Sequence, residues 1–220
     1  MDFSEVIAQR YSVRAFRPDP LPRALIERIL GDALKSASWC NTQPWQLIIT
    51  EGAATDRFRE ALWAHVNSGK SANPDIPFPV KYHGAHYDRR KTCAMQLYAS
   101  LGIADGDRQA SFAQTLKNFR LFEAPHVMIV TSHESLGSYG ALDCGLFVQS
   151  FLLSATNQGV GTIAQAAIAA YSDFIREHFA IAPEQRILCG VSFGYADPSH
   201  PANQFRTERA TLEELVRWEG

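Results

Sequence analysis

The chain has 220 residues, 46% of them hydrophobic, which is enough for one large domain with a substantial core. The formal net charge is −2, so the sequence lacks the basic footprint expected of a DNA- or RNA-binding protein. The N-terminal stretch has no apolar signal region, the apolar stretch 141–156 is too short and too interrupted to span a bilayer, and the four cysteines are scattered. We therefore expect a soluble cytoplasmic protein with reduced thiols.

Hydrophobic periodicity predicts helices over residues 2–9, from 22 to about 33, and over 54–65, with a buried strand over 45–50. Further helices are predicted over 91–101, 107–122, 139–158 and 172–179, with strands over 126–131 and 186–195. The helix over 139–158 is apolar almost all round, so we expect it to be buried. Helices that alternate with few strands predict an α+β fold with a central mixed β-sheet flanked by helices.

Two segments lack this patterning. Residues 68–88 hold three prolines, three aromatic residues and two histidines, and loops of this length inside compact domains are usually functional. We interpret them as a variable, mobile or substrate-side loop. The tail over 198–220 has too little apolar pattern to fold alone, so we expect it to lie on another surface, such as a second subunit. The whole chain, 1–220, is predicted to be one domain.

The arm over residues 10–16 reads RYSVRAF and carries the clearest chemical signal. Arg10 and Arg14 each offer a planar fork of donors that fits a phosphate, and Ser12 adds a hydroxyl between them. A solvated surface pair, worth little energetically, is the alternative for two such arginines. In a chain close to charge balance, the arm favours a small phosphorylated ligand.

Residues 38–45 read SWCNTQPW, and together with the arm they resemble the two N-terminal signatures of the FMN-dependent nitroreductase family. Downstream, Asn118 ahead of Ala124 and Pro125, the glycine turn over 159–162, the Gly-Tyr pair at 194–195 and the tail segment RTER at 206–209 fall in the family's order. The resemblance therefore covers nearly the whole chain. Within the family the sequence is most similar to reductases of nitrobenzoate-type compounds.

The resemblance implies a homodimer of α+β subunits that exchange terminal segments, with one FMN in each of two pockets at the interface. In this arrangement Arg10, Ser12 and Arg14 hold the phosphate and ribityl end of FMN. Arg206 or Arg209 returns from the tail to the same phosphate. A second group is implied to reach the flavin of the neighbouring subunit, and it consists of Ser38, Asn41 and Gln43. The alternative for these residues is a helix stop followed by polar turn residues.

The flavin edge is implied to lie near residues from two other segments. Asn118 could hydrogen-bond the pyrimidine edge of the flavin because an amide supplies both a donor and an acceptor, whereas the alternative is a water-facing helix position. Ile163, Ala164 and Gln165 are implied to bring backbone N–H groups to flavin N5. Several family members carry a Glu-Gly pair nearby, so the sequence assigns no role to the Gln165 side chain.

The activity implied by the resemblance is reduction of nitroaromatic compounds by NADH or NADPH in a ping-pong hydride transfer through FMN, because the cofactor carries the chemistry. No catalytic side chain is expected. Activated alkenes, quinones and halophenols are alternative substrates for the same chemistry, and a non-catalytic flavin-binding protein is the alternative of another class. A metal site at His83, His86, Asp88 and Cys93 is weakly indicated and not expected. Cys144, in an apolar helix, is interpreted as packing.

Overall fold

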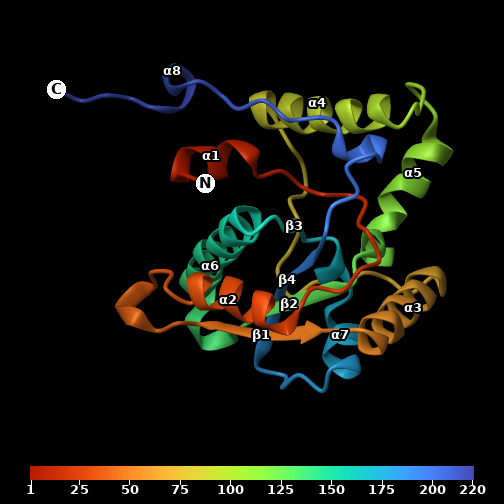
Figure 1. Ribbon diagram of the computed structural model, residues 1–220, viewed down its shortest axis with the longest axis vertical. Coiled ribbons are helices and arrows are strands. Elements are labelled where there is room, and N and C mark those ends of the chain that lie inside the picture. The colour runs from red at the N-terminus through yellow and green to blue at the C-terminus, as the bar shows by residue number, and fades with distance from the viewer.

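The structure is a computed structural model that describes residues 1–220 and contains eight α-helices and four β-strands (Figure 1). The helices are α1 (Phe3–Gln9), α2 (Arg23–Ala33), α3 (Ala53–Asn67), α4 (Gly84–Ser100), α5 (Arg108–Leu116), α6 (Gly137–Asn157), α7 (Ser172–His178) and α8 (Leu212–Leu215). The strands are β1 (Trp45–Thr50), β2 (His126–His133), β3 (Gly161–Gln165) and β4 (Gln185–Gly194). Every predicted helix and strand is present. The largest differences are the early start of α4 and a 3₁₀ segment, Lys117–Glu123, in place of the predicted end of a longer α-helix.

The four strands form one sheet in the order β1-β2-β4-β3, and every neighbouring pair is antiparallel. The prediction of a mixed sheet was wrong in this respect, since the one parallel pairing is an isolated bridge between Ser12 and Thr162. The reason lies in the long connection between β1 and β2, which contains three α-helices, as a crossover between parallel strands would. Thr50 pairs with Val127, so this connection returns to the same end of the sheet that it leaves.

Helices cover both faces of the sheet, with α2 and α6 on one side of the strands and α3 and α7 on the other (Figure 1). The central strand β2 is buried along most of its length, and its residues alternate between the two layers because successive side chains of a strand point to opposite faces. Met128 and Val130 pack with Phe147 and Phe151 of α6. The neighbouring residues of β2 pack with α3 and α7 in a second cluster.

Helix α6 is not buried all round, contrary to the sequence expectation. With the preceding turn it is long and apolar enough, by length and composition alone, to cross a membrane. One face lies in the core, but Tyr139, Leu142 and Leu146 are 58%, 59% and 46% exposed. These three side chains, the α6 stripe, recur at positions typical of one helix face. The helix thus packs on the sheet with one face and presents apolar side chains outward with the other.

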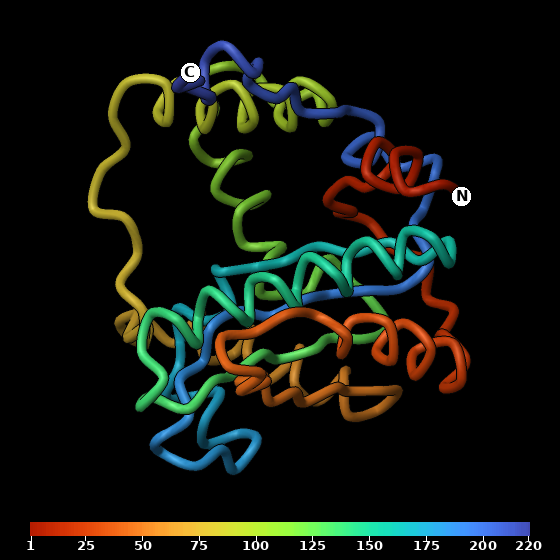
Figure 2. Tube along the Cα trace, turned by 90° about the vertical axis from the view of Figure 1, so that its left-hand side faces the viewer, coloured from red at the N-terminus to blue at the C-terminus, as the bar shows by residue number.

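The loop after α3 is shorter and more firmly attached than the sequence suggested. It ends at His83, where α4 begins. Midway along it Asp75 accepts hydrogen bonds from Arg176 Nη2 and from the backbone N–H of Ile187, both at 2.7 Å. Beyond this anchor the loop carries exposed apolar side chains, and Val80 is fully exposed. The loop is therefore fixed to the body at Asp75 and projects from it afterwards (Figure 2).

The C-terminal tail leaves the sheet and runs beside α4 in both views (Figures 1 and 2). An ion pair between Arg89 and Glu214 joins the two at 2.7 Å. Leu212, Leu215 and Trp218 of the tail are 67%, 67% and 83% exposed. The tail therefore lies against α4 of its own chain and leaves these apolar side chains exposed.

Candidate functional site

The cationic arm, residues 10–16, is held by β3, by the end of β4 and by the start of the tail. The backbone N–H of Val13 donates to the carbonyl of Thr162 at 2.9 Å, and that of Arg17 donates to the carbonyl of Tyr195 at 2.8 Å. Asn203, which is buried, accepts from the backbone N–H of Arg14 at 2.8 Å and donates to the carbonyl of Ala15 at 2.9 Å. These contacts bring the arm, β3 and the tail to one place, although they are far apart in sequence.

A cavity of about 540 Å³ lies where these segments meet, a volume typical of small-ligand sites. The structure brings five of the predicted phosphate-end residues to its wall, namely Arg10, Ser12, Arg14, Arg206 and Arg209. No Asp or Glu lines this cavity, and none of its four arginines forms an ion pair. Four guanidinium groups without a counter-charge favour an anionic ligand.

The electrostatics of the arginines agree with their crowding. Burial lowers the pKa of Arg10, and the nearby positive charge of Arg209 lowers it further. Burial is also the main cause that lowers the pKa of Arg14. Both residues stay protonated at neutral pH because arginine starts from a very high value. The lowered pKa values reflect partial burial and mutual repulsion of the positive charges, both of which a bound anion would offset.

Two aromatic rings orient the arginines, and neither was predicted from the sequence. The guanidinium of Arg206 lies 3.6 Å from the ring centroid of Tyr11, and that of Arg14 lies 5.5 Å from the ring centroid of Phe205. Such cation–π contacts hold a guanidinium plane in place without neutralising its charge. Tyr11 lies within the arm, between Arg10 and Ser12, so its position in the motif was the sequence signal that could have identified it. Phe205 and the buried Asn203 had no comparable signal.

A second cavity, of about 310 Å³, shares Ser12, Arg14 and Cys93 with the first and so continues it along β3. It is lined by the residues predicted to meet the flavin edge, namely Asn118, Ile163, Ala164 and Gln165. The Gln165 side chain is buried and donates from Nε2 to the backbone carbonyl and to Oδ1 of Asn118, at 3.0 and 3.2 Å. The two predicted groups therefore form one continuous surface.

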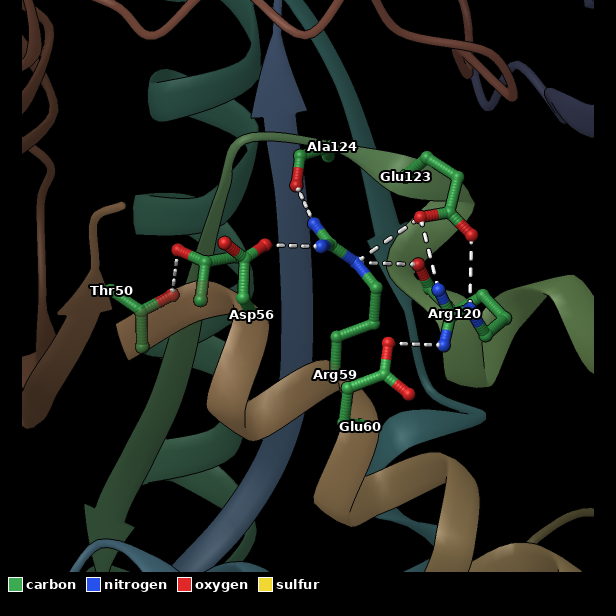
Figure 3. Close-up of polar contacts among 8 residues, drawn as sticks. Thr50, Asp56, Arg59, Glu60, Arg120, Glu123 and Ala124 are labelled. Atoms are coloured by element: carbon green, nitrogen blue, oxygen red, sulfur yellow. Dashed lines mark hydrogen bonds and ion pairs between the residues drawn. The ribbon is translucent and has the colours of Figure 1, made fainter. Parts of the chain in front are cut away.

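A buried arginine supports the wall that contains Asn118. Arg59 of α3 donates from Nε to the carbonyl of Arg120 at 3.2 Å, and from Nη2 to the carbonyl of Ala124 (Figure 3). Between these two carbonyls, Leu121, Phe122 and Glu123 all have positive φ, at 56°, 50° and 59°. Three successive non-glycine residues in this region are strained and persist only where the surroundings hold them. Arg59 thus fixes the turn that follows Asn118.

The third predicted group does not line either cavity. Ser38 is partly buried and its hydroxyl accepts from the backbone N–H of Gln43 at 3.0 Å, while Asn41 and Gln43 are exposed. Asn41 and Gln43 both have positive φ, so the segment is a tight turn that displays its polar side chains outward. The neighbouring Trp39 contacts Tyr139 of the α6 stripe, with ring centroids 4.4 Å apart.

The alternative chemistries have little support in the geometry. No group of three or more His, Cys, Asp or Glu side chains is placed to hold a metal ion. Burial raises the pKa of the Cys144 thiol to about 11 and that of Cys189 to about 12, which keeps both protonated at neutral pH. The interpretation of Cys144 as a packing residue agrees with this, since a reactive thiol needs a lowered pKa.

An antiparallel sheet between helical layers and a cavity lined by four unpaired arginines together define a protein suited to bind a phosphorylated ligand. The chain belongs to the nitroreductase family, whose profile matches residues 7–195.

Several characterised relatives match across most of the chain. Nitroreductase NfnB of Mycolicibacterium smegmatis is 32% identical over 97% of this chain and 91% of its own length. A 4-nitrobenzoate reductase of Pseudomonas putida is 31% identical over 100% of this chain and 96% of its own. Among solved structures, the FMN and NADPH-dependent nitroreductase NfnB from sphigopyxis sp. strain HMH superposes with a TM-score of 0.96 at 31% identity, covering 100% of both chains.

Proposed function

We propose that this protein is an FMN-dependent NAD(P)H oxidoreductase that reduces nitroaromatic compounds. The observation that carries the proposal is the carboxylate-free cavity of Arg10, Arg14, Arg206 and Arg209, which continues into the surface formed by Asn118 and β3. Such a site suits a ligand with an anionic end and a flat polar ring. The similarity to nitroreductases and 4-nitrobenzoate reductases favours nitroaromatics over alkenes, quinones or halophenols.

The residues present fit FMN. The four arginines and Ser12 would hold its phosphate and ribityl chain, and Asn118 with the β3 backbone would meet its ring. When bound, FMN supplies the hydride chemistry that links NADH or NADPH to the nitro compound. The chain's own part is to bind, orient and shield. No catalytic side chain is proposed, because the hydride chemistry belongs to the cofactor.

We further propose a homodimer that completes the site. The α6 stripe and Trp39 form an exposed apolar surface of the kind found at protein interfaces. Ser38, Asn41 and Gln43 lie beside this surface, so pairing through it would carry them towards the neighbouring subunit. The exposed apolar tail would then wrap the partner. The protein is proposed to act in the cytoplasm as a single-domain chain, with the loop before α4 on the substrate side.

The dimer has a direct test. Leu142→Glu places a charge in the α6 stripe and should give a monomer that retains less FMN. Arg57→Glu, on an exposed position of α3 across the sheet, is the matched control and should remain dimeric. Analytical ultracentrifugation with absorbance at the flavin band reports both quantities. A monomeric wild-type protein, or a dimeric Leu142→Glu variant, would contradict the interface.

The activity is tested by purifying the protein, adding FMN and measuring consumption of NADH and of NADPH with 4-nitrobenzoate. We expect FMN binding and reduction of the nitro group with at least one nicotinamide. An enone and a halophenol under the same conditions serve as comparison substrates. A protein that retains no flavin absorbance once free FMN is removed would refute the cofactor. A protein that binds FMN but reduces only the enone or the halophenol would refute the substrate class.

A further inference from the structure

A chain of three polar side chains runs from the interior of the sheet to the second cavity. Ser192 of β4 is fully buried, and its hydroxyl donates to Oε1 of Gln165. Gln165 of β3 is 3% exposed and donates from Nε2 to both oxygen atoms of Asn118. Asn118 in turn donates from Nδ2 to the carbonyl of Thr115 at 2.9 Å and lines the cavity.

The direction of this chain is fixed by one backbone atom. The carbonyl oxygen of Asn118 can only accept, so the Gln165 amide must turn Nε2 towards it. Oε1 then faces Ser192, whose rotatable hydroxyl can donate. Nε2 also faces the Asn118 side chain, which must therefore present Oδ1 to Gln165. Turning either amide over would place two acceptors or two donors against each other in a buried site, which is costly.

One donor is left over at the end of the chain. Nδ2 of Asn118 carries two hydrogens, and only one is used by Thr115. We propose that Gln165 is a positioning residue that holds Asn118 as a hydrogen-bond donor towards the cavity, where it recognises an acceptor atom on the edge of the bound ring. This inference rests on the proposed function, because FMN is the ligand whose ring it orients.

The chain requires a neutral amide at position 165. A glutamate there would accept from Ser192 as Gln165 does, but its carboxylate would face the two oxygens of Asn118 without a hydrogen to donate. Protonation of the carboxyl group would restore a donor at the same place. Burial and the two facing oxygens both raise the pKa expected for such a glutamate. The defect of Gln165→Glu should therefore disappear on acidification.

The test is FMN binding to Gln165→Glu, followed by quenching of flavin fluorescence across about pH 5 to 8, the range in which a buried glutamate with a raised pKa titrates. The FMN phosphate titrates in the same range, so the quantity compared is the ratio of the variant's dissociation constant to that of the wild type. We expect this ratio to be about tenfold or more at the alkaline end, equivalent to about 1.4 kcal/mol. It should fall towards one at the acidic end. The wall also holds Arg14, Arg90, Cys93 and Tyr98, which are common to both proteins and cancel in the ratio.

A second variant guards against a general packing defect. Gln165→Met keeps the length of the side chain without its hydrogen bonds, so FMN should bind more weakly at every pH. In an Asn118→Ala background, Gln165→Met should cause no further loss, because the residue through which Gln165 acts is gone. This cycle also decides the matter if Gln165→Glu does not fold.

The outcomes separate the two proposals. A ratio that does not change with pH, or additive losses in the Asn118→Ala background, would overturn the positioning role while wild-type FMN binding stands. A wild-type protein that does not bind FMN would overturn the proposed function instead.

Discussion

Replacement of Arg59 by alanine should destabilise the protein strongly, although Arg59 lines neither cavity. Its side chain is 9% exposed and satisfies the carbonyls of Arg120 and Ala124 on either side of the positive-φ turn (Figure 3). In Arg59→Ala these two carbonyls lose their side-chain partner, which is the contact that joins both ends of the strained turn to α3. The turn that shapes the Asn118 wall should then relax.

The magnitude follows from the number and type of bonds lost. A hydrogen bond from a charged group contributes about 1.5–3 kcal/mol, so losing two should cost roughly 3–6 kcal/mol of unfolding free energy. The ion pair with Asp56, at 2.6 Å, adds little because that carboxylate is 69% exposed. Asp56→Asn is therefore the matched control, with an expected cost below about 1 kcal/mol.

Urea unfolding of the FMN-free proteins at neutral pH, followed by tryptophan fluorescence, measures both changes. Arg59→Ala should lower the unfolding midpoint far more than Asp56→Asn does. FMN affinity of the folded fraction should also fall in Arg59→Ala, since Asn118 precedes the released turn, Phe122 lies in it, and both line the second cavity. Similar losses of stability in the two variants would mean that Arg59 does not hold the turn through its carbonyls.

Three further predictions concern charge and titration. Arg14→Ala should weaken FMN binding roughly ten- to hundredfold, the equivalent of one charge-assisted hydrogen bond, and unchanged affinity in a fluorescence titration would contradict the phosphate site. Alkylation of the monomeric Leu142→Glu variant by iodoacetamide at neutral pH should modify the exposed Cys40 and spare Cys144, whose pKa is raised by burial to about 11. Peptide mass spectrometry measures both sites, and faster modification of Cys144 than of Cys40 would contradict this order. Burial lowers the pKa of His126, so its stabilising effect is complete above about pH 6.5 and is lost as the pH falls towards the lower folded pKa. Urea midpoints should therefore fall more steeply with decreasing pH in the wild type than in His126→Gln. An equal pH dependence in the two proteins would exclude His126 as a source of the acid destabilisation.

The sequence predicted the elements well because local patterns determine them. Alternating apolar residues and β-rich runs marked β1, β2 and β4, and capping and periodicity marked most helices. Strand direction could not be predicted in this way, since it depends on where the long connection after Thr50 returns. The exposed face of α6 was missed for a related reason, because the apolar pattern of a helix does not show which of its faces packs on the sheet.

The candidate site was predicted in its charged groups and missed in its supporting ones. Arg10 and Arg14 lie in a recognisable motif, whereas Asn203 and Phe205 act through contacts between segments that are distant in sequence. The hydrogen bonds between Gln165 and Asn118 join β3 to the 3₁₀ segment after α5, two parts of the chain that no local sequence pattern connects. Their direction follows from a backbone carbonyl, which only the folded chain places there.

The most direct test of the account is an anaerobic two-step flavin experiment with the purified protein. FMN is bound, NADPH or NADH is added in stoichiometric amount, and 4-nitrobenzoate follows after the nicotinamide is consumed. We predict that the flavin's visible absorption band is lost in the first step and returns in the second, without any second protein being added. A bound flavin that neither nicotinamide bleaches, or a bleached flavin that 4-nitrobenzoate fails to reoxidise, would contradict the proposed reaction.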